Sequence, residues 1–292
     1  MTLRADPTLM LELTNGQFVE TASETPTIYP LQNVLFAGTT AYCKIVIAKN
    51  PTYGKIFFLD EELQSAESDQ ALYHEMLVHP IMNATYVPDK KRRVLVVGAG
   101  EGVTVQEVLK WPDIEEVVWV DIDGDLVDMC RRHLAWTKDE TYNDPRLRFI
   151  ANDIREVIPT LTHKYDVILL DLPDPDAEEI ESDEDALYGD SFWTLINSVL
   201  APGGGIASHV GSIAPGENEA VQRPGLHLLK SRYGGHGYHC PLPSFQGEWG
   251  FWMSVPPNTI NHFPSACDLM DVETQTHAFA WPRYWTSSRL GV

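Results

Sequence analysis

Short apolar runs separated by turn residues predict a β-rich region over residues 1–80. The runs at 41–48 and 55–59 flank a segment that contains both proline and glycine, which is typical of a hairpin turn. Apolar residues then recur at helical spacing over 69–82, so we expect a helix there.

From residue 94 onward the pattern alternates between apolar strands and amphipathic helices, which predicts a parallel sheet with helices on both faces. The expected strands lie at 94–98, 117–121, 147–151, 166–171 and 206–210. The expected helices lie at 102–111, 124–135, 153–161 and 188–200. Two further strands, near 237–241 and 249–255, are expected to close the edge of the sheet. We interpret 211–235 as loop and helix, and 256–292 as an irregular tail. The chain therefore reads as an α/β protein with an N-terminal β-rich domain at 1–80 and a doubly wound domain at 81–292.

A glycine-rich turn follows the strand at 94–98. It runs from Gly98 through Gly100 to Gly102 and opens the next helix, and about 20 residues later the following strand ends in Asp121. In a doubly wound sheet such glycines let the backbone approach a nucleoside, and the acidic residue accepts hydrogen bonds from the ribose hydroxyls. The pattern predicts a nucleoside cofactor.

Glu101 lies within this turn and narrows the choice of nucleoside. A carboxylate at this position repels a pyrophosphate and attracts a cation. S-adenosylmethionine and its decarboxylated form carry an amine and a sulfonium but no phosphate. Glu101 therefore favours these two molecules over NAD.

The composition fits a globular protein with a sizeable core, since 43% of the 292 residues are hydrophobic and 22% are charged. No apolar run reaches the roughly 18 residues of a membrane span, and no secretory signal is visible at the N-terminus. The four cysteines are scattered, which argues against a disulfide framework or a zinc site and favours the cytoplasm.

The formal net charge of −21 disfavours nucleic acid as a partner, because nucleic-acid binding needs basic residues. It also attracts cationic ligands over long range. A merely solubilising acidic surface, or adaptation to salt, explains the total charge equally well, so the placement of the acidic residues matters more.

Asp171 ends the fourth strand of the predicted sheet, and Asp174 follows in a turn stiffened by prolines. The segment 171–190 contains ten acidic residues and no lysine or arginine. Because ligands bind at the carboxyl edge of such sheets, this loop is placed to hold a polycationic amine and to accept the proton that the amine loses on attack. A solvated acidic loop without a ligand is the alternative.

Gln64, Asp69 and Tyr73 precede or begin the helix at 69–82 and could face one ligand, although Tyr73 alone reads more readily as a core aromatic. His74, Glu75 and His79 could suggest a metal, but they lack the histidine pair at i and i+4 that zinc proteases use, so we expect no metal.

Asp153 follows the third strand of the sheet. Its carboxylate can accept a hydrogen bond from an adenine amino group, or it can cap the next helix. One residue can fill both roles at once.

Taken together, these motifs resemble the polyamine aminopropyltransferases, the family of spermidine, spermine and thermospermine synthases, over residues 42–255. The segment 54–75 looks like the start of the family's catalytic region, 98–102 like its glycine loop and 171–175 like its aspartate loop. The details that lean toward the thermospermine branch are 64–67, Glu101, and Pro243-Ser244-Phe245 before Trp249-Gly250-Phe251.

The resemblance implies a small N-terminal β domain on a Rossmann-like S-adenosylmethionine-dependent transferase domain, associated as a homodimer or homotetramer. It implies transfer of an aminopropyl group from decarboxylated S-adenosylmethionine to a polyamine, with release of methylthioadenosine. No metal is implied.

Carried onto this sequence, the resemblance assigns three groups of residues. The expected catalytic residues are Asp171, Tyr73 and Asp174. The expected cofactor-binding residues are Gln64, Gly98, Gly100, Glu101, Asp121 and Asp153. The expected substrate-binding residues are Asp69, His74, Phe245 and Trp249.

Three departures from the family pattern leave other functions open. Cys43 and Lys44 stand where the family usually has Gln-Asp, Gln70 replaces an acidic residue, and His209 replaces a glutamine. Because of Cys43, Lys44 and His209, an S-adenosylmethionine-dependent N-methyltransferase of a small amine or specialised metabolite is the first alternative. Lys44 could favour a donor that retains its carboxylate, or strand alternation could point it outward. A polyamine- or nucleoside-binding module without catalysis is the second.

Overall fold

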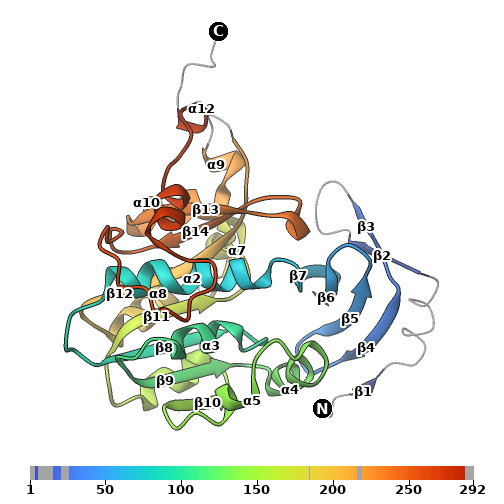
Figure 1. The fold of residues 1–292 in the computed structure, drawn as a ribbon, viewed down its shortest axis with the longest axis horizontal. Coiled ribbons are helices and arrows are strands. Elements are labelled where there is room, and N and C mark those ends of the chain that lie inside the picture. Colours follow the sequence, from blue (N-terminus) through green and yellow to red (C-terminus); the bar gives the residue numbers. More distant parts are fainter. Residues whose placement is uncertain (1–3, 6–15, 21–25, 184, 216–218, 287–292) are drawn as a thin grey trace.

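The computed structural model describes residues 4–5, 16–20, 26–183, 185–215 and 219–286. Two main sheets are connected by the long helix α2 (Gln70–Ala84), and a small antiparallel pair of strands lies beside the first sheet (Figure 1). The rest of the predicted β-rich region, at 1–3, 6–15 and 21–25, lies outside the described residues.

The N-terminal sheet is antiparallel, with the strand order β1-β4-β5-β6-β7. Its strands are β1 (Arg4–Ala5), β4 (Asn33–Thr39), β5 (Lys44–Asn50), β6 (Gly54–Leu59) and β7 (Glu62–Ala66), and the separate pair is β2 (Gln17–Glu20) and β3 (Thr27–Pro30). The predicted hairpin is confirmed, since Asn50 pairs with Gly54 and the Asn50 side chain accepts hydrogen bonds from two backbone N–H groups of the turn. Strands β4 and β7 were not predicted, because small and polar residues interrupt their apolar runs.

The second sheet has seven strands in the order β10-β9-β8-β11-β12-β14-β13. The first five run parallel to one another, and β14 pairs antiparallel with both β12 and β13, which confirms the α/β prediction. In chain order they are β8 (Arg92–Gly98), β9 (Ile114–Asp121), β10 (Leu147–Ala151), β11 (Tyr165–Asp171), β12 (Leu200–Ile213), β13 (His236–Leu242) and β14 (Gly247–Met253).

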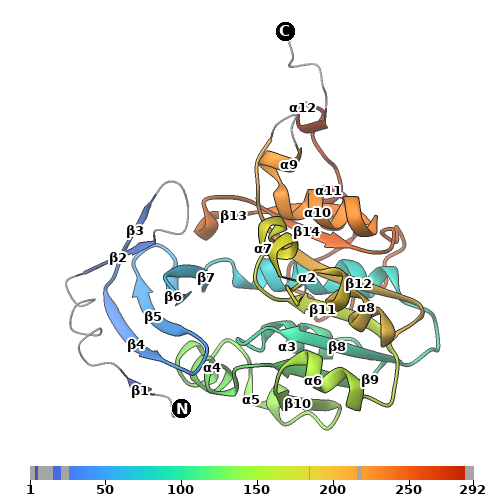
Figure 2. The same ribbon diagram turned by 180° about the vertical axis from the view of Figure 1, so that it is seen from behind.

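Helices cover both faces of this sheet (Figure 2). Val94 and Val96 of β8 pack with α2 and α3 on one face, whereas Leu95 and Val97 pack with α6, α8 and α10 on the other. Alternate residues of one strand are thus buried on opposite faces, which explains why the central strands read as continuous apolar runs. Besides α2, the helices are α3 (Val103–Leu109), α4 (Gly124–Met129), α5 (Asp139–Tyr142), α6 (Ile154–Val157), α7 (Ala177–Ser182), α8 (Asp190–Ser198), α9 (Glu219–Gln222), α10 (Pro224–Tyr233), α11 (Val272–Ala278) and α12 (Arg283–Thr286).

Several predicted boundaries were wrong. The helix expected at 124–135 is α4 followed by a π-helical turn, Cys130–Leu134, and the helix expected at 153–161 is α6 followed by a 3-10 turn, Ile158–Thr160. The tail after residue 256 is not wholly irregular, because α11 and α12 form there. A short 3-10 turn, Pro243–Phe245, precedes β14.

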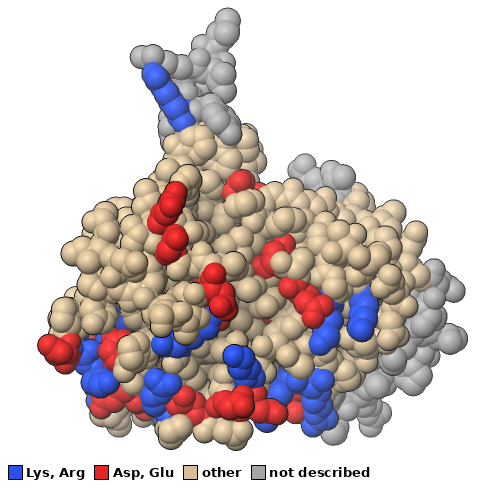
Figure 3. Space-filling view, in the orientation of Figure 1, with Lys and Arg blue, Asp and Glu red and all other residues tan. Residues whose placement is uncertain are grey.

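The boundary that we placed after residue 80 falls inside α2, and α2 packs into the core of the seven-stranded sheet. The division of the chain into two domains stays a prediction. On the face shown in Figure 3, lysine and arginine side chains lie among acidic ones rather than forming a patch of their own. Within the described ranges, no helix has the length and apolarity that crossing a membrane requires.

A buried polar cluster ties the C-terminal segment to α2. The Glu75 carboxylate accepts hydrogen bonds from the backbone N–H groups of Asp268, Leu269 and Met270, at 2.8–2.9 Å. Ligand atoms of Glu75, His79 and Cys267 lie within 4.8 Å of one another, an arrangement that could hold a metal ion. These atoms already have protein partners.

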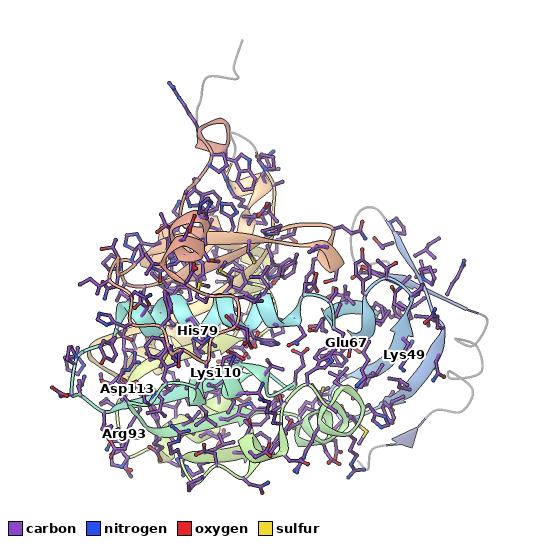
Figure 4. The ribbon with its side chains drawn as sticks, viewed as in Figure 1. Lys49, Glu67, His79, Arg93, Lys110 and Asp113 are labelled. Carbon is purple, nitrogen blue, oxygen red and sulfur yellow. The ribbon has the colours of Figure 1, made fainter. Side chains whose placement is uncertain are left out.

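The two ring nitrogens of His79 show this most clearly. Its Nδ1 accepts a hydrogen bond from the Trp111 indole at 3.1 Å, and its Nε2 lies 3.1 Å from Glu107 Oε2. Lys110 Nζ lies 2.7 Å from the same Glu107 oxygen and supplies the positive charge, close to His79 between α2 and α3 (Figure 4). The cluster therefore serves to hold the chain after residue 266 against the helices.

Glu75→Gln is expected to lower the free energy of unfolding by about 2 kcal/mol, because an amide replaces one of the oxygens that buried N–H groups need. Denaturant unfolding measures the change. Asp268→Asn is the matched control, since that side chain is 84% exposed, and it is expected to change stability by less than about 0.5 kcal/mol. Equal stability of wild type and Glu75→Gln would contradict this account of the cluster.

Candidate active site

A cavity of about 740 Å³ lies where the carboxyl ends of β8, β9 and β11 meet the N-terminal sheet. It is lined by residues from both sheets, from α2 and from the loop after β11. Most of the residues that the sequence singled out are among them: Gln64, Tyr73, Gly98, Gly100, Glu101, Asp121, Asp153, Asp171, Asp174, Phe245 and Trp249. The fold therefore brings together segments that are far apart in the sequence.

The glycine turn follows β8 directly and packs against the end of β11. Gly98 has φ +80°, and a Cβ there would lie 2.0 Å from the backbone oxygen of Asp171. The next residue, Ala99, donates its backbone N–H to that same oxygen at 3.2 Å. Only glycine allows this approach, so Gly98 fixes the distance between the turn and Asp171.

Glu101 carries an unused acceptor at the cavity. Its Oε2 lies 3.5 Å from His74 Nε2, whereas its Oε1 is buried and has no hydrogen-bond partner among the described residues. Burial lowers the pKa of the His74 imidazole, but Glu101 outweighs burial and the net pKa lies above the ordinary value. A buried carboxylate oxygen with a free lone pair is a site for an ammonium group.

Asp171 is held by two hydroxyl groups. Tyr73 donates to Asp171 Oδ1 at 2.6 Å, and Thr104 donates to Oδ2 at 2.8 Å. Burial, and then the Asp171 charge, raises the pKa of Tyr73 well above its ordinary value, so the phenol keeps its proton and acts as a donor. The carboxylate is fixed in orientation while its side chain is still 9% exposed toward the cavity.

Thr104 was missed by the sequence analysis. It lies in the first turn of α3, where its hydroxyl also contacts His74 Nδ1 at 2.9 Å. Nothing in the apolar pattern marks a threonine at this position as different from any other. Its contact depends on the close approach of α3 to β11, which only the tertiary structure reveals.

Asp121 and Asp153 lie at the tips of neighbouring strands. Burial raises the pKa of Asp121 to about 6. The Asp153 side chain accepts a hydrogen bond from the backbone N–H of Arg155 at 2.8 Å and so caps α6. The cap is one of the two roles considered for Asp153, and its place in the cavity lining leaves the adenine contact open as a prediction.

Asp69 and His74 are not among the cavity-lining residues, so the structure does not place them in direct contact with a substrate. Each supports a residue that does line it. Asp69 accepts hydrogen bonds from the backbone and the hydroxyl of Ser244, both at 2.8 Å, and so holds the segment that carries Phe245. His74 lies behind Glu101.

Cys43 and His209 line the cavity, but Lys44 does not. Lys44 Nζ pairs with Glu61 at 3.0 Å, and the side chain is a third exposed. Lys44 therefore no longer supports the methyltransferase alternative, which had rested on it together with Cys43 and His209.

Comparison with known proteins agrees with this geometry. Residues 70–258 match the family model described as the spermine/spermidine synthase domain, and residues 19–67 match the spermidine synthase tetramerisation domain. The chain belongs to the spermine/spermidine synthase family. The closeness to the thermospermine branch stays a prediction.

Two curated relatives illustrate the likeness. Polyamine aminopropyltransferase 2 of Pseudomonas aeruginosa is 35% identical over 238 residues, which are 81% of this chain and 66% of that protein. Polyamine aminopropyltransferase of Aeropyrum pernix is 32% identical over 228 residues, 77% of this chain and 70% of that protein.

Solved structures confirm the fold. The crystal structure of spermidine synthase from Thermotoga maritima matches with a TM-score of 0.74 at 22% identity, covering 92% of this chain and 91% of that one. A spermidine synthase in complex with the transition state analogue AdoDATO matches with a TM-score of 0.75 at 22% identity, covering 97% and 96%.

The raised pKa of Asp121 predicts a pH dependence of nucleoside binding. If Asp121 holds the ribose, as the sequence predicts, its ionised carboxylate can accept hydrogen bonds from both ribose hydroxyls above about pH 6, and the protonated group below that pH loses part of this capacity. Calorimetric titration with methylthioadenosine is expected to show weaker binding as the pH falls through 6. Asp121→Asn is expected to bind about tenfold more weakly at neutral pH and to lack this transition. The same profile in both proteins would show that Asp121 does not contact the ligand.

Proposed function

We propose that this protein transfers an aminopropyl group from decarboxylated S-adenosylmethionine to a polyamine and releases methylthioadenosine. The observation that carries the proposal is the fixed Asp171 carboxylate, held by Tyr73 and Thr104 in the same cavity as the unused oxygen of Glu101. Membership of the spermine/spermidine synthase family supports it, as do the names of the curated relatives.

In this proposal the donor lies along the carboxyl edge of the sheet. Asp121 accepts the ribose hydroxyls, Asp153 contacts the adenine, and Gln64 with the glycine turn completes the donor site. Glu101 binds the ammonium of the aminopropyl chain. A methyl donor would carry an additional carboxylate at that end, which the Glu101 charge would repel.

The reaction is a direct displacement. The lone pair of the acceptor nitrogen forms a bond to the carbon next to sulfur, and the carbon–sulfur bond breaks with its electron pair passing to the sulfonium sulfur. The proton on the attacking nitrogen passes to the Asp171 carboxylate, which Tyr73 and Thr104 keep in position. Alignment of the two reactants in a partly dry cavity supplies most of the rate.

The acceptor is expected to enter along the acidic loop after β11. Among the described residues of this loop, five acidic ones line the cavity, namely Asp171, Asp174, Glu179, Asp183 and Asp185. Glu62 on β7 faces them, and burial, together with the Asp174 charge, raises its pKa. So many carboxylates in one cavity favour an acceptor with more than one positive charge.

We further propose that the protein forms a homodimer or homotetramer, which the match to a tetramerisation domain supports. The absence of metal, nucleic-acid and membrane partners, and a cytoplasmic location, stay predictions from the sequence.

Incubation with spermidine and each donor in turn tests the function. With decarboxylated S-adenosylmethionine, mass spectrometry is expected to show spermidine heavier by one aminopropyl group, together with methylthioadenosine. With S-adenosylmethionine no product is expected. A methylated amine would establish the methyltransferase alternative, and binding without any product would establish a binding module.

Asp171→Asn is expected to lower kcat at least about a hundredfold, because the amide cannot accept the proton of the attacking amine. Donor affinity is expected to stay within about twofold, because Asp121, Asp153 and Glu101 are unchanged. Asp176→Asn is the matched control on the same loop. Asp176 caps α7, and asparagine caps a helix equally well. A parallel loss of donor binding and turnover in Asp171→Asn would contradict the assignment.

A further inference from the structure

His209, on β12, occupies the acceptor end of the cavity beside Asp174. Its Nε2 lies within hydrogen-bond distance of the backbone oxygen of Leu172, and its Nδ1 lies 3.1 Å from Asp174 Oδ1. The ring stacks on Trp249 at an interplanar angle of 18° and lies 5.8 Å from the Tyr73 ring. The imidazole is thus wedged between the aspartate loop and β14.

Asp174 is seated against β12 on its other side. A Cβ on Gly211, which has φ +78°, would lie 2.1 Å from Asp174 Oδ2. The carboxylate therefore fits between the backbone at Gly211 and the imidazole of His209. About half of the Asp174 side chain is still exposed, so an incoming ligand can reach it.

The surroundings of the His209 ring require two protons on it. The Leu172 carbonyl can only accept, so Nε2 carries a hydrogen. Nδ1 lies at ion-pair distance from Asp174 Oδ1, although the geometry is not that of a hydrogen bond. A lone pair on Nδ1 would be repelled by the charge of this carboxylate, so Nδ1 carries a hydrogen as well. The arrangement is favourable when His209 is an imidazolium and Asp174 is ionised.

Few other groups in the described residues act on this imidazole. Asp171 and Asp174 face it from the aspartate loop and Tyr73 faces it from α2, whereas Trp249 of β14 carries no charge. Burial lowers the pKa of His209, but Asp174 and then Asp171 outweigh burial, and the net pKa lies above the ordinary value. Tyr73 keeps its proton throughout the neutral range.

We infer that His209 is a specificity-determining residue whose imidazolium is an internal cation paired with Asp174. The amine acceptor binds by replacing this imidazolium as the partner of Asp174, and His209 then loses its Nδ1 proton. This inference rests on the proposed function. The ammonium of the acceptor and the imidazolium compete for one carboxylate. When the amine pairs with Asp174, His209 loses the charge that kept it protonated, and the Nδ1 proton passes to solvent.

This coupling has a definite sign. Acceptor affinity rises with pH, by up to tenfold for each pH unit below the pKa of His209, because one proton is released for each acceptor bound. Above that pKa the dependence disappears. An amine with a single charge loses more affinity at low pH than one that can also use the other carboxylates of the loop.

Calorimetric titration of spermidine into the protein saturated with methylthioadenosine tests the coupling between about pH 6 and pH 9, a range that brackets ordinary histidine pKa values of about 6.5 and above. His209→Gln keeps an N–H that can donate to Leu172 but cannot titrate. Wild type is expected to release up to one more proton per spermidine than His209→Gln, measured in two buffers of different ionisation enthalpy. The Kd of the variant is expected to depend less steeply on pH.

His239→Gln is the matched control. His239 pairs with Glu248 at 2.8 Å on β13 and β14, it is as buried as His209, and it does not line the cavity. This variant is expected to keep the proton release of wild type. If His209→Gln does not fold, the imidazole nitrogen resonances of wild type decide, since spermidine should move those of His209 toward the neutral form.

The outcomes separate the two proposals. If wild type neither binds spermidine nor forms product, the proposed function fails and this inference with it. If wild type turns over but releases the same number of protons as His209→Gln, or if the His209 resonances do not move, only this inference is overturned.

Discussion

The structure depends on keeping many carboxylates together in a cavity that is partly closed to water. Burial raises the pKa of both Asp121 and Glu62, and the charges of neighbouring carboxylates raise it further. The fold offsets this cost with fixed donors. Two hydroxyl groups donate to Asp171, and a backbone N–H donates to Asp121. His74 lies next to Glu101, and His209 lies next to Asp174. Glu101 Oε1 is left without a hydrogen-bond partner among the described residues.

The same constraint explains the backbone. Gly98 and Gly211 both adopt positive φ, and at each a side chain would collide with the aspartate loop. One glycine contacts the backbone of Asp171 and the other the carboxylate of Asp174. The loop therefore packs between the backbone at Gly98 and the backbone at Gly211, which fixes both aspartates relative to the glycine turn. In the proposed reaction, distances of this kind decide whether the donor carbon and the acceptor nitrogen can meet.

Much of this could be predicted from the sequence. The apolar runs of β8, β9 and β11 are strong signals, and their ends place Gly98, Asp121 and Asp171 at one edge of a sheet. The support of these residues could not be predicted, because it comes from contacts across long separations, such as Thr104 with Asp171 and Asp69 with Ser244. The side to which Lys44 points could not be predicted, because a strand residue can face either side of a sheet; in the structure its Nζ pairs with Glu61, and the residue does not line the cavity.

A crystal structure of the protein with decarboxylated S-adenosylmethionine tests the central claim most directly. The account predicts the ribose on Asp121, the aminopropyl ammonium within hydrogen-bond distance of Glu101, and the carbon next to sulfur facing the Asp171 carboxylate. A ligand bound with Glu101 and Asp171 both turned away from it, or a phosphate bound over the turn at Gly98, would contradict the account.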